Sequence, residues 1–356
     1  MSFADFMEIA LYHPQLGYYS RAEDPVGKGG DFVTGPALSP LFAFALGRLL
    51  REFLSRAGDE VSTVVDIGCG DGSLIHSLWD EARMMPRAPR FYGVDRSLER
   101  IDAAHGAGGA PRFVRSLEEV PGDGVHLLIA NELFDALPFA RLVQRGEHLH
   151  ELWVTERDGE LDWSEHEAAA PYEDYFAARG VELADGQFVD LSLEWEREYA
   201  GICRYLRRGL IVTFDYGFPE KQLFDARFRR FGTAASYQRH RVSRDLLAEP
   251  GLRDLTAHIN FTDLIRGGER EGLRTLYFDR QAKFLLALGA AGYELLRPVE
   301  EMEIASLEEG VATLERRDEA RRLLLPDGIG DDLRVLVQEK GFDASGWSFQ
   351  RSIFDR

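Results

Sequence analysis

The sequence predicts an α/β protein built on a parallel, doubly wound sheet. Short apolar segments typical of buried strands alternate with helical patterns between residues 63 and 130, and a glycine-rich turn follows the first of these strands. In addition, the predicted strands end in acidic residues, as at Asp95 and Asp215. Ligands of open α/β sheets bind beyond the carboxyl ends of the strands, so we expect the functional site at that edge.

Two helices are predicted before the sheet begins. Ser2 can cap a helix over residues 2–12, because an acidic residue stands at the third position. Ser39 followed by Pro40 is typical of the start of a second helix, whose apolar residues recur at a period near 3.6. Between the two helices, residues 21–37 are rich in glycine and are predicted to form a loop.

The strands of the predicted sheet are short and apolar. They cover Thr63–Ile67, Arg90–Val94, Arg112–Val114, Val125–Ala130 and Leu210–Phe214, with helices predicted over Ser73–Ala82 and 97–104. A long interruption separates the fourth of these strands from the fifth, so the regular alternation does not continue along the whole chain.

The chain has 356 residues, which is enough for a large domain with insertions or for two domains. We expect it to divide into four parts. These are an N-terminal helical segment and loop over 1–58; a Rossmann-like core over 59–140, about 210–217 and parts of 280–356; an insertion with a small β element and helices over 141–209; and a mostly helical, substrate-side region over 218–290.

Composition excludes several classes of protein. A net charge of −19 argues against nucleic-acid binding, which requires a basic surface, but it suits a cationic protein segment as partner. No apolar run approaches the roughly 18–20 residues that a membrane span needs. The first residues are acidic rather than basic, so no targeting signal is recognised and a cytoplasmic location is expected. Cys69 and Cys203 make neither a disulfide framework nor a metal site.

The strongest local motif is the turn that follows the first strand, with glycines at positions 68, 70 and 72. Gly68, Gly70 and Gly72 let the backbone turn sharply and let a ligand approach closely. Their spacing differs from the dinucleotide motif, and the carboxylate of Asp66 would repel a pyrophosphate. That carboxylate would suit the α-ammonium group of S-adenosylmethionine. The alternative is a purely structural turn with incidental glycines.

Asp95 closes the second strand, where an acidic residue can accept hydrogen bonds from both ribose hydroxyls of a nucleoside. The alternative role for Asp95 is to cap the helix that follows. Ser116 and Leu117 follow the third strand, at a position suited to flank an adenine. Together with the glycine turn, these residues predict a site for S-adenosylmethionine.

The fourth strand ends in an unusually polar segment at the same edge of the sheet. Asn131 is predicted to face the cofactor, and Glu132 and Asp135 would share one face of a helical turn. Asp215, at the end of the fifth strand, is predicted to lie beside them. The alternative is that Asn131 caps a helix whose dipole favours the acids.

In combination, these segments resemble the MidA-like methyltransferases, the family of a mitochondrial complex I assembly factor that methylates a protein arginine. The matching segments are Gly17–Tyr19, Gly30–Thr34, Ala130–Pro138, Asp215–Gly217, His240–Arg241, Asp254–Asp263 and Pro326–Gly330. The resemblance implies a class I methyltransferase fold, S-adenosyl-L-methionine as cofactor, and Gly30 and Thr34 among the cofactor-binding residues. It also implies a protein arginine as acceptor and a link to respiratory complex assembly.

The chain departs from the family pattern at several positions. Ala37 stands where the family has an acid, the first strand ends in Asp66-Ile67-Gly68-Cys69-Gly70 rather than E-L-G-P-G, and residues 232–235 lack an arginine. We therefore expect the choice of substrate to differ from that of the mitochondrial relative.

For an arginine acceptor, paired carboxylates can hold the guanidinium through two hydrogen bonds. Glu132 and Asp135 are the candidates, and Asp215 and His258 complete the predicted catalytic residues. A small-molecule methyltransferase is an alternative, in which His240 or His258 would act as a base. A second alternative is an assembly factor that binds S-adenosylmethionine without catalysis. The sequence does not predict an oligomeric state.

Overall fold

The computed structural model describes residues 1–20, 39–83, 85, 87–97, 111–238, 241–297, 306–325 and 329–350. Gly30, Thr34, Ala37 and His240 lie outside the described residues, as does nearly all of the helix predicted over 97–104. The predictions for those positions therefore stay predictions.

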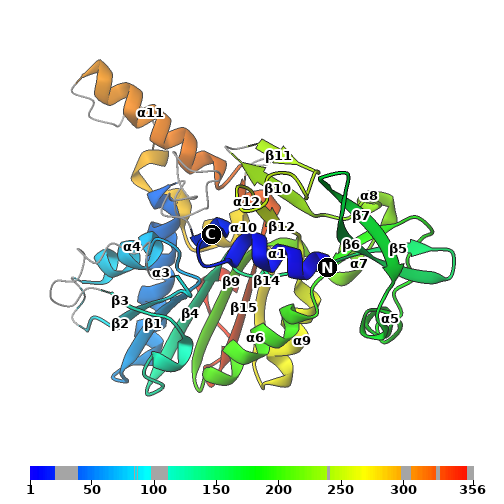
Figure 1. Ribbon diagram of the computed structural model, residues 1–356. Coiled ribbons are helices and arrows are strands. Elements are labelled where there is room, and N and C mark those ends of the chain that lie inside the picture. Colours follow the sequence, from blue (N-terminus) through cyan, green and yellow to red (C-terminus); the bar gives the residue numbers. More distant parts are fainter. Residues whose placement is uncertain are drawn as a thin grey trace.

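A mostly parallel sheet forms the centre of the protein (Figure 1). Its strands run in the order β14-β15-β9-β4-β1-β2-β3, and β13 pairs with β9. Their bounds are β1 Ser62–Ile67, β2 Arg90–Val94, β3 Arg112–Val114, β4 Val125–Asn131, β9 Gly209–Phe218, β13 Ile259–Asn260, β14 Arg274–Arg280 and β15 Leu333–Lys340. The predicted doubly wound α/β fold is confirmed, and β15 is antiparallel to both of its neighbours. Strand order reverses between β1 and β4, which is where such sheets bind their ligands.

Both faces of the sheet are covered by helices, because neighbouring residues of a strand point to opposite sides. On β1, Val64 belongs to one apolar cluster and Val65 to the other. The first face carries α3 (Pro40–Ala57), α4 (Ser73–Ala82) and α10 (Gln281–Ala287), and the second carries α6 (Glu194–Tyr205) and α9 (Phe261–Arg270). This arrangement explains why the strands are apolar runs rather than alternating patterns.

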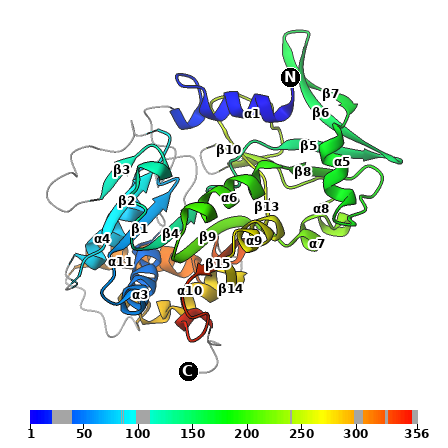
Figure 2. The ribbon, with the colours of Figure 1, turned by 90° about the horizontal axis from the view of Figure 1, so that it is seen from below.

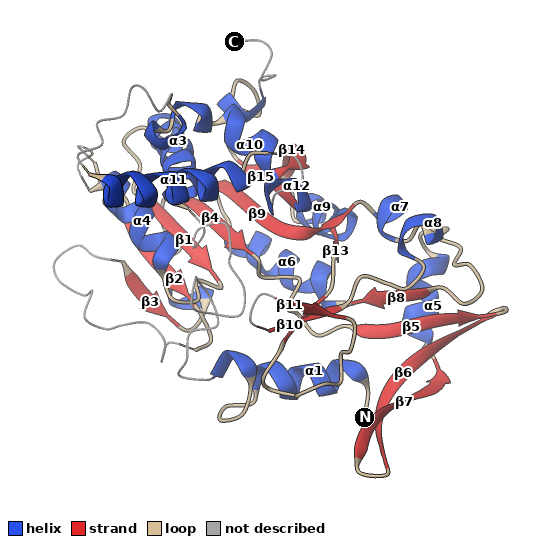
Figure 3. Cartoon of the chain, turned by 90° about the horizontal axis from the view of Figure 1, so that it is seen from above, coloured by secondary structure: helices blue, strands red, loops and turns tan. Residues whose placement is uncertain are grey.

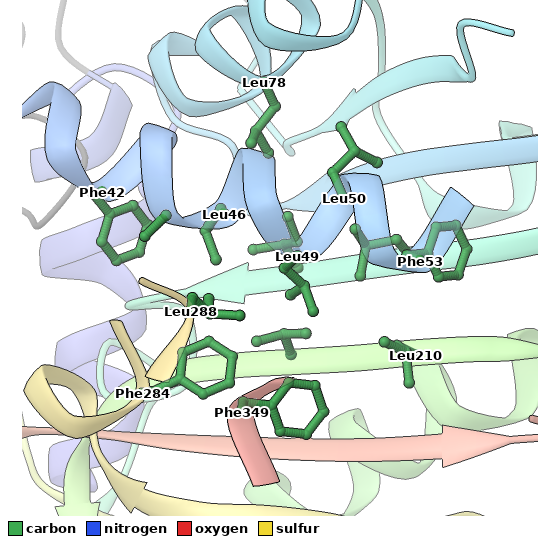
Figure 4. Packing of buried hydrophobic residues seen from close by; sticks show 14 of the residues in the cluster. Phe42, Leu46, Leu49, Leu50, Phe53, Leu78, Leu210, Phe284, Leu288 and Phe349 are labelled. Carbon is green, nitrogen blue, oxygen red and sulfur yellow. The ribbon is translucent and has the colours of Figure 1, made fainter. Parts of the chain in front are cut away.

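Helix α3 is the largest contributor to the first apolar face. Figure 4 shows Leu46 and Leu49 of α3 directed toward the sheet, with Phe284 of α10 on the opposite side of the same cluster. Ser39 caps α3 through a hydrogen bond from the Leu41 amide, and Pro40 is its first residue, as predicted. Burying one such leucine contributes about 1.5–3 kcal/mol, so α3 fixes the position of the strands beneath it.

A second α+β region lies beside the core sheet (Figure 3). It contains a four-stranded sheet in the order β7-β6-β5-β8 and a three-stranded sheet in the order β11-β10-β12. The bounds are β5 Ala140–Arg145, β6 His148–Arg157, β7 Glu160–Glu167, β8 Phe188–Leu191, β10 Ala235–Gln238, β11 Arg241–Ser243, β12 Asp254–Thr256, α5 Ala170–Ala177, α7 Glu220–Leu223 and α8 Ala226–Arg229. The small β element expected in 141–209 is therefore present.

The expectation of a mostly helical region over 218–290 was wrong. The described part of that region contains β10, β11, β12, β13 and β14 as well as helices. The first four of these strands have only two to four residues, which is too short for a strand to show its alternation of apolar and polar positions. β14 belongs to the core sheet. Helix α6, from the predicted insertion, also packs on the core sheet.

The N-terminal helix α1 (Phe3–Tyr12) belongs to the second region (Figure 2). Ser2 caps it, as predicted, by accepting a hydrogen bond from the Asp5 amide. Its apolar face, including Phe3 and Met7, packs against Phe139, Val154, Leu255 and neighbouring residues. The N-terminal segment is thus divided, since α1 packs on the second region and α3 on the core sheet.

The remaining described elements are short or peripheral. They are α11 (Leu307–Arg322), α12 (Ile329–Asp332) and the 3₁₀ turns η1 (Tyr18–Ser20), η4 (Leu117–Glu119), η5 (Ala290–Gly292), η6 (Glu294–Leu296) and η8 (Ser348–Gln350). None of the helices in the described ranges combines the length and the apolar character needed to cross a bilayer. The longest of them, α3, has 18 residues and carries four charged side chains.

Candidate active site

A cavity of about 1240 Å³ opens at the carboxyl ends of β1, β2 and β4. This volume exceeds the range of about 300–1,000 Å³ that is common for a single ligand. The predicted site residues that line it are Asp66, Gly68, Gly70, Asp95, Ser116, Leu117, Asn131, Glu132, Asp135 and His258. Gly72 and Asp215 do not line it. Residues from four separate predicted strand ends therefore meet in one space, which is large enough for a cofactor and part of an acceptor.

The three glycines of the turn have different roles. All three have positive φ, at 72° for Gly68, 54° for Gly70 and 78° for Gly72. A Cβ atom at Gly68 would lie 2.7 Å from the side chain of Leu133, and one at Gly72 would lie 2.8 Å from the ring of Phe113. At Gly70 a Cβ atom would meet no protein atom within 4 Å, although the residue lines the cavity. Gly70 is therefore the glycine that leaves room for a ligand, and the other two allow close packing.

The carboxylate of Asp95 holds the glycine turn in place. One oxygen accepts a hydrogen bond from the Gly70 amide at 3.0 Å, and the other accepts one from the Ser97 amide at 2.9 Å. The second bond resembles the capping role considered as the alternative for this residue. Each carboxylate oxygen can accept a further hydrogen bond, and Asp95 lines the cavity, so both roles are compatible.

Asp66 is a buried carboxyl group at the end of β1, with a side chain only 2% exposed. Burial raises its pKa to about 8, and the nearby charges of Asp71 and Asp95 act in the same direction. A buried acid of this kind becomes favourable as a carboxylate when a cation lies against it. The residues present therefore fit a ligand that carries an ammonium group, such as the α-ammonium of S-adenosylmethionine.

The segment after β3 also lines the cavity. Ser116 starts the 3₁₀ turn η4, and the carboxylate of Glu119 accepts hydrogen bonds from the amides of Arg115 and Ser116 at 3.0 and 3.1 Å. Leu117 presents a partly buried apolar side chain. This combination of a fixed backbone and an apolar surface is consistent with the predicted adenine position, which stays a prediction.

The segment after β4 is not the helical turn that we predicted, and the alternative of a capped helix is also excluded. Residues 132–139 form bends and turns, and Glu132 has a φ of 51°, which is unusual for a residue other than glycine. The Glu132 amide still donates to the Phe214 carbonyl of β9 at 2.8 Å. This hydrogen bond extends the strand pairing by one residue and prevents a helix from starting. Strained residues cluster at functional sites.

Asn131 supports the carboxylate that follows it. Its side-chain amide donates to Glu132 at 3.3 Å. Its side-chain oxygen is buried and has no hydrogen-bond partner among the described residues. Buried polar atoms are nearly always satisfied, so this oxygen is a candidate acceptor for a ligand group in the cavity.

The structure contradicts the prediction that Asp215 faces the reacting groups. Its side chain is fully buried, and it accepts hydrogen bonds from the amides of Phe134 and Tyr216 at 2.8 Å each. The reason is that β9 continues through this residue to Phe218, so the carboxyl group points under the loop instead of out of the sheet. Burial and the charge of Glu132 hold the pKa of Asp215 above its ordinary value. Asp215 therefore positions the loop.

His258 lines the cavity and lies near two aromatic rings. Its ring centroid lies 6.3 Å from that of Tyr216 and 5.4 Å from that of Phe218. Burial, together with nearby arginines, lowers the pKa of His258 to about 4. The imidazole is therefore neutral at physiological pH and is a weak base, and its buried Nδ1 has no partner among the described residues.

Several residues that line the cavity were not predicted as functional. Tyr12, Tyr19 and Asp254 come from α1, η1 and β12, and Ile202 and Tyr205 come from α6. Tyr19 and Asp254 lie in segments that resemble the MidA-like family, and that resemblance was the available signal. For the α6 residues the sequence carries no signal, because a helix in an insertion shows only its amphipathic pattern.

Two solved structures from Burkholderia thailandensis are similar to this chain over 99% of its length. The structure bound to S-adenosyl-homocysteine has a TM-score of 0.85 and 28% identity, and 91% of that chain is covered. A native crystal structure has a TM-score of 0.82 and 28% identity, with 90% covered. These matches confirm the predicted fold class, and they support the predicted cofactor because S-adenosyl-homocysteine is its product.

Two curated relatives are named protein arginine methyltransferase NDUFAF7 or its homologue. The Drosophila melanogaster protein is 28% identical over 294 residues, and the Danio rerio protein is 25% identical over 314 residues. These matches cover 72% and 74% of this chain but only 64% and 67% of the relatives. Both relatives are named mitochondrial proteins, which contradicts the cytoplasmic location that we predicted.

The family model described as "Putative S-adenosyl-L-methionine-dependent methyltransferase" matches residues 45–279. This range contains the glycine turn, the acidic loop after β4 and the segment around His258. It thus includes most of the residues that line the cavity. The chain belongs to this family of S-adenosyl-L-methionine-dependent methyltransferases.

Proposed function

We propose that this protein transfers a methyl group from S-adenosylmethionine to an arginine of a protein. The observation that carries the proposal is that one cavity joins the glycine turn of β1 to a set of acidic side chains from the loop after β4. The names of the relatives support the acceptor class.

The cofactor end of the cavity is formed by Asp66, Gly70 and Asp95. In our proposal, Asp66 binds the α-ammonium, Gly70 leaves room for the ligand, and Asp95 accepts hydrogen bonds from the ribose. The cofactor supplies a methyl group on a sulfonium; transfer breaks the S–C bond, forms an N–C bond and leaves one proton to be removed from the acceptor nitrogen. The protein itself has to supply position, dehydration and a proton acceptor.

The acidic loop supplies what a guanidinium acceptor needs. Asp135 is only 5% exposed, and burial, with the charges of Asp215 and Asp254, holds its pKa well above the ordinary value. Such a group gains a hydrogen-bonded cation as partner when a guanidinium enters. Glu132 is partly exposed at the cavity wall, so it is our candidate for the group that accepts the proton.

The state of His258 argues against this residue as the histidine base of a small-molecule methyltransferase, while His240 lies outside the described residues. General bases work best when their pKa lies near the operating pH. The pKa of His258, at about 4, lies well below that range. An arginine acceptor held by carboxylates needs no histidine base, so the low pKa of His258 is compatible with the proposed function.

The test is incubation of the purified protein with isotope-labelled S-adenosylmethionine and proteins from a lysate, followed by mass spectrometry. We expect labelled methylarginine at one or a few sites, and none with the Gly70→Val variant. The resemblance to the complex I assembly factor makes subunits of respiratory NADH dehydrogenase the first proteins to examine. Label in a small metabolite, with none in arginine, would contradict the proposal.

A further inference from the structure

One wall of the cavity comes from outside the core sheet. Tyr12 at the end of α1, Tyr19 in η1 and Asp254 in β12 all line the cavity, and we call these three residues the outer wall. α1 packs on the second region rather than on the core sheet (Figure 2). The outer wall is therefore built on elements other than those that form the cofactor end.

The outer wall is joined to the acidic loop by direct hydrogen bonds and ring contacts. The Tyr12 hydroxyl donates to the carbonyl of Ala136 at 2.8 Å, next to Asp135. The Tyr19 hydroxyl donates to the carboxylate of Asp254 at 2.8 Å. The two tyrosine rings stack, with centroids 5.5 Å apart and an angle of 27° between their planes. The ring pair thus connects the loop that carries Asp135 to β12, which carries Asp254.

The segments that carry the outer wall are closely packed, which restricts the movement of its side chains. A Cβ atom at Gly17 would lie 2.4 Å from the His13 nitrogen, so the turn between α1 and η1 is closely packed. Tyr18 is 3% exposed and packs edge-on against Tyr19 at 5.2 Å. The Leu255 amide donates to the Asp254 carboxylate at 2.9 Å. A site built from such fixed side chains is preorganised for its ligand.

The outer wall and the acidic loop each contribute a buried carboxyl group to the cavity. Asp135 and Asp254 are 5% and 3% exposed, and the charge of Asp254 is one of the causes that raise the pKa of Asp135. Within the described residues, no side chain donates a hydrogen bond to Asp135, and it forms no salt bridge. The guanidinium of Arg96 lies 5.9 Å from the Tyr12 ring, at the limit of a cation–π contact. A buried carboxyl group without a side-chain donor, such as Asp135, is stabilised as a carboxylate when a cation lies against it.

We infer that Asp135 and Asp254, together with the rings of Tyr12 and Tyr19, form the subsite that binds the guanidinium of the acceptor. A guanidinium is planar, donates hydrogen bonds to carboxylates in a fixed geometry and stacks on aromatic rings. These properties match two carboxyl groups beside a stacked pair of tyrosines. The inference rests on the proposed function and deepens it: Asp254 replaces Glu132 as the partner of Asp135, which leaves Glu132 to accept the proton.

The experiment measures binding rather than turnover. The full chain, saturated with S-adenosylhomocysteine, is titrated by calorimetry with acetyl-Gly-Arg-Gly-amide and with the same peptide carrying citrulline, the neutral isostere of arginine. We expect the arginine peptide to bind at least about 10-fold more tightly than the citrulline peptide, since a charged hydrogen-bonded partner is lost. Asp135→Asn and Asp254→Asn should each weaken arginine binding by about 10- to 100-fold, and Tyr19→Phe by less.

Two controls separate the subsite from general effects. Asp174→Asn removes the same charge on the exposed face of α5, outside the cavity, and should bind the arginine peptide like the original protein. The Asp254→Asn variant should keep its affinity for S-adenosylhomocysteine and its melting temperature, because the asparagine oxygen can still accept the Leu255 and Tyr19 hydrogen bonds. The Asp135→Asn variant should keep both as well, since no side chain in the described part of the chain donates to Asp135.

The outcomes distinguish the subsite from the proposed function. Equal binding of the arginine and citrulline peptides, or unchanged arginine binding in both asparagine variants, would overturn the subsite even if the protein methylates arginine elsewhere. Selective arginine binding that depends on Asp135 and Asp254 would support the subsite, even if the lysate experiment showed no methylarginine and the proposed function failed.

Discussion

The two walls of the cavity differ in how they are built. The wall at the cofactor end is local, because a strand, a glycine turn and the next strand end bring Asp66, Gly70 and Asp95 together within 30 positions of the chain. The outer wall joins Tyr12 and Tyr19 to Asp254, which lies more than 200 positions away. A local wall can be predicted from a motif, whereas a wall assembled from distant segments needs the tertiary structure. The predictions below test whether the two walls also have separate functions.

The largest expected effect is on the local wall. Gly70→Val should reduce the affinity for S-adenosylhomocysteine by roughly 100-fold or more, because the side chain fills the space beside Asp95 and strains a residue at positive φ. Isothermal titration calorimetry measures the affinity. Gly272→Val is the matched control, since Gly272 also has positive φ and open space around it but lies outside the cavity. Equal loss in both variants would show that strain alone is responsible.

The next effect concerns the loop between the two walls. Glu132→Gln should lower the rate of methyl transfer by about 100-fold, because the amide cannot accept the proton from the acceptor nitrogen. The affinity for S-adenosylhomocysteine should stay the same, since no cofactor contact is assigned to this carboxylate. Single-turnover kinetics with a protein acceptor found in the lysate experiment measures the rate. An unchanged rate would exclude Glu132 as the proton acceptor.

Asp95→Ala should weaken binding of both S-adenosylmethionine and S-adenosylhomocysteine by about 1.5–3 kcal/mol, the range for hydrogen bonds to a charged group. Both ligands should be affected alike, because they share the ribose. Competition binding against a labelled analogue measures the two affinities. If only one ligand bound more weakly, Asp95 would not be the ribose partner.

The smallest effect is a pH dependence set by Asp66. Its pKa of about 8 means that the carboxyl group is protonated in the unliganded protein below that pH. An ammonium group favours the carboxylate, so binding below pH 8 must release the proton. Affinity for S-adenosylhomocysteine should therefore be highest above pH 8 and fall by up to about tenfold for each pH unit below it. The Asp66→Asn variant should bind weakly with little pH dependence, and a flat profile in the original protein would contradict this linkage.

Much of the core could be predicted because its signals are local. The strands around Val64 and Leu127 are apolar on both faces, and Ser39 followed by Pro40 marks a helix start without reference to the rest of the chain. The short strands of residues 235–260 could not be predicted, because segments of two to four residues show no period.

The errors at the site have one physical origin. Spacing alone placed Glu132 and Asp135 on a helical turn, but hydrogen bonding to β9 continues through Glu132 and excludes that turn. The same extension of β9 buries Asp215 under the loop. Strand length depends on pairing with neighbours rather than on the residues of the strand itself, so these side chains could be assigned to the site region but not given their orientation.

The left-handed backbone of Glu132 has a consequence for selection experiments. A residue other than glycine at this φ costs roughly 1 kcal/mol, so Glu132→Gly should raise the melting temperature while removing the carboxylate. A library screened for heat resistance would therefore enrich glycine at position 132, and a library screened for methyl transfer would discard it. Opposite enrichment at one position would show that the protein keeps a less stable loop for the sake of its chemistry.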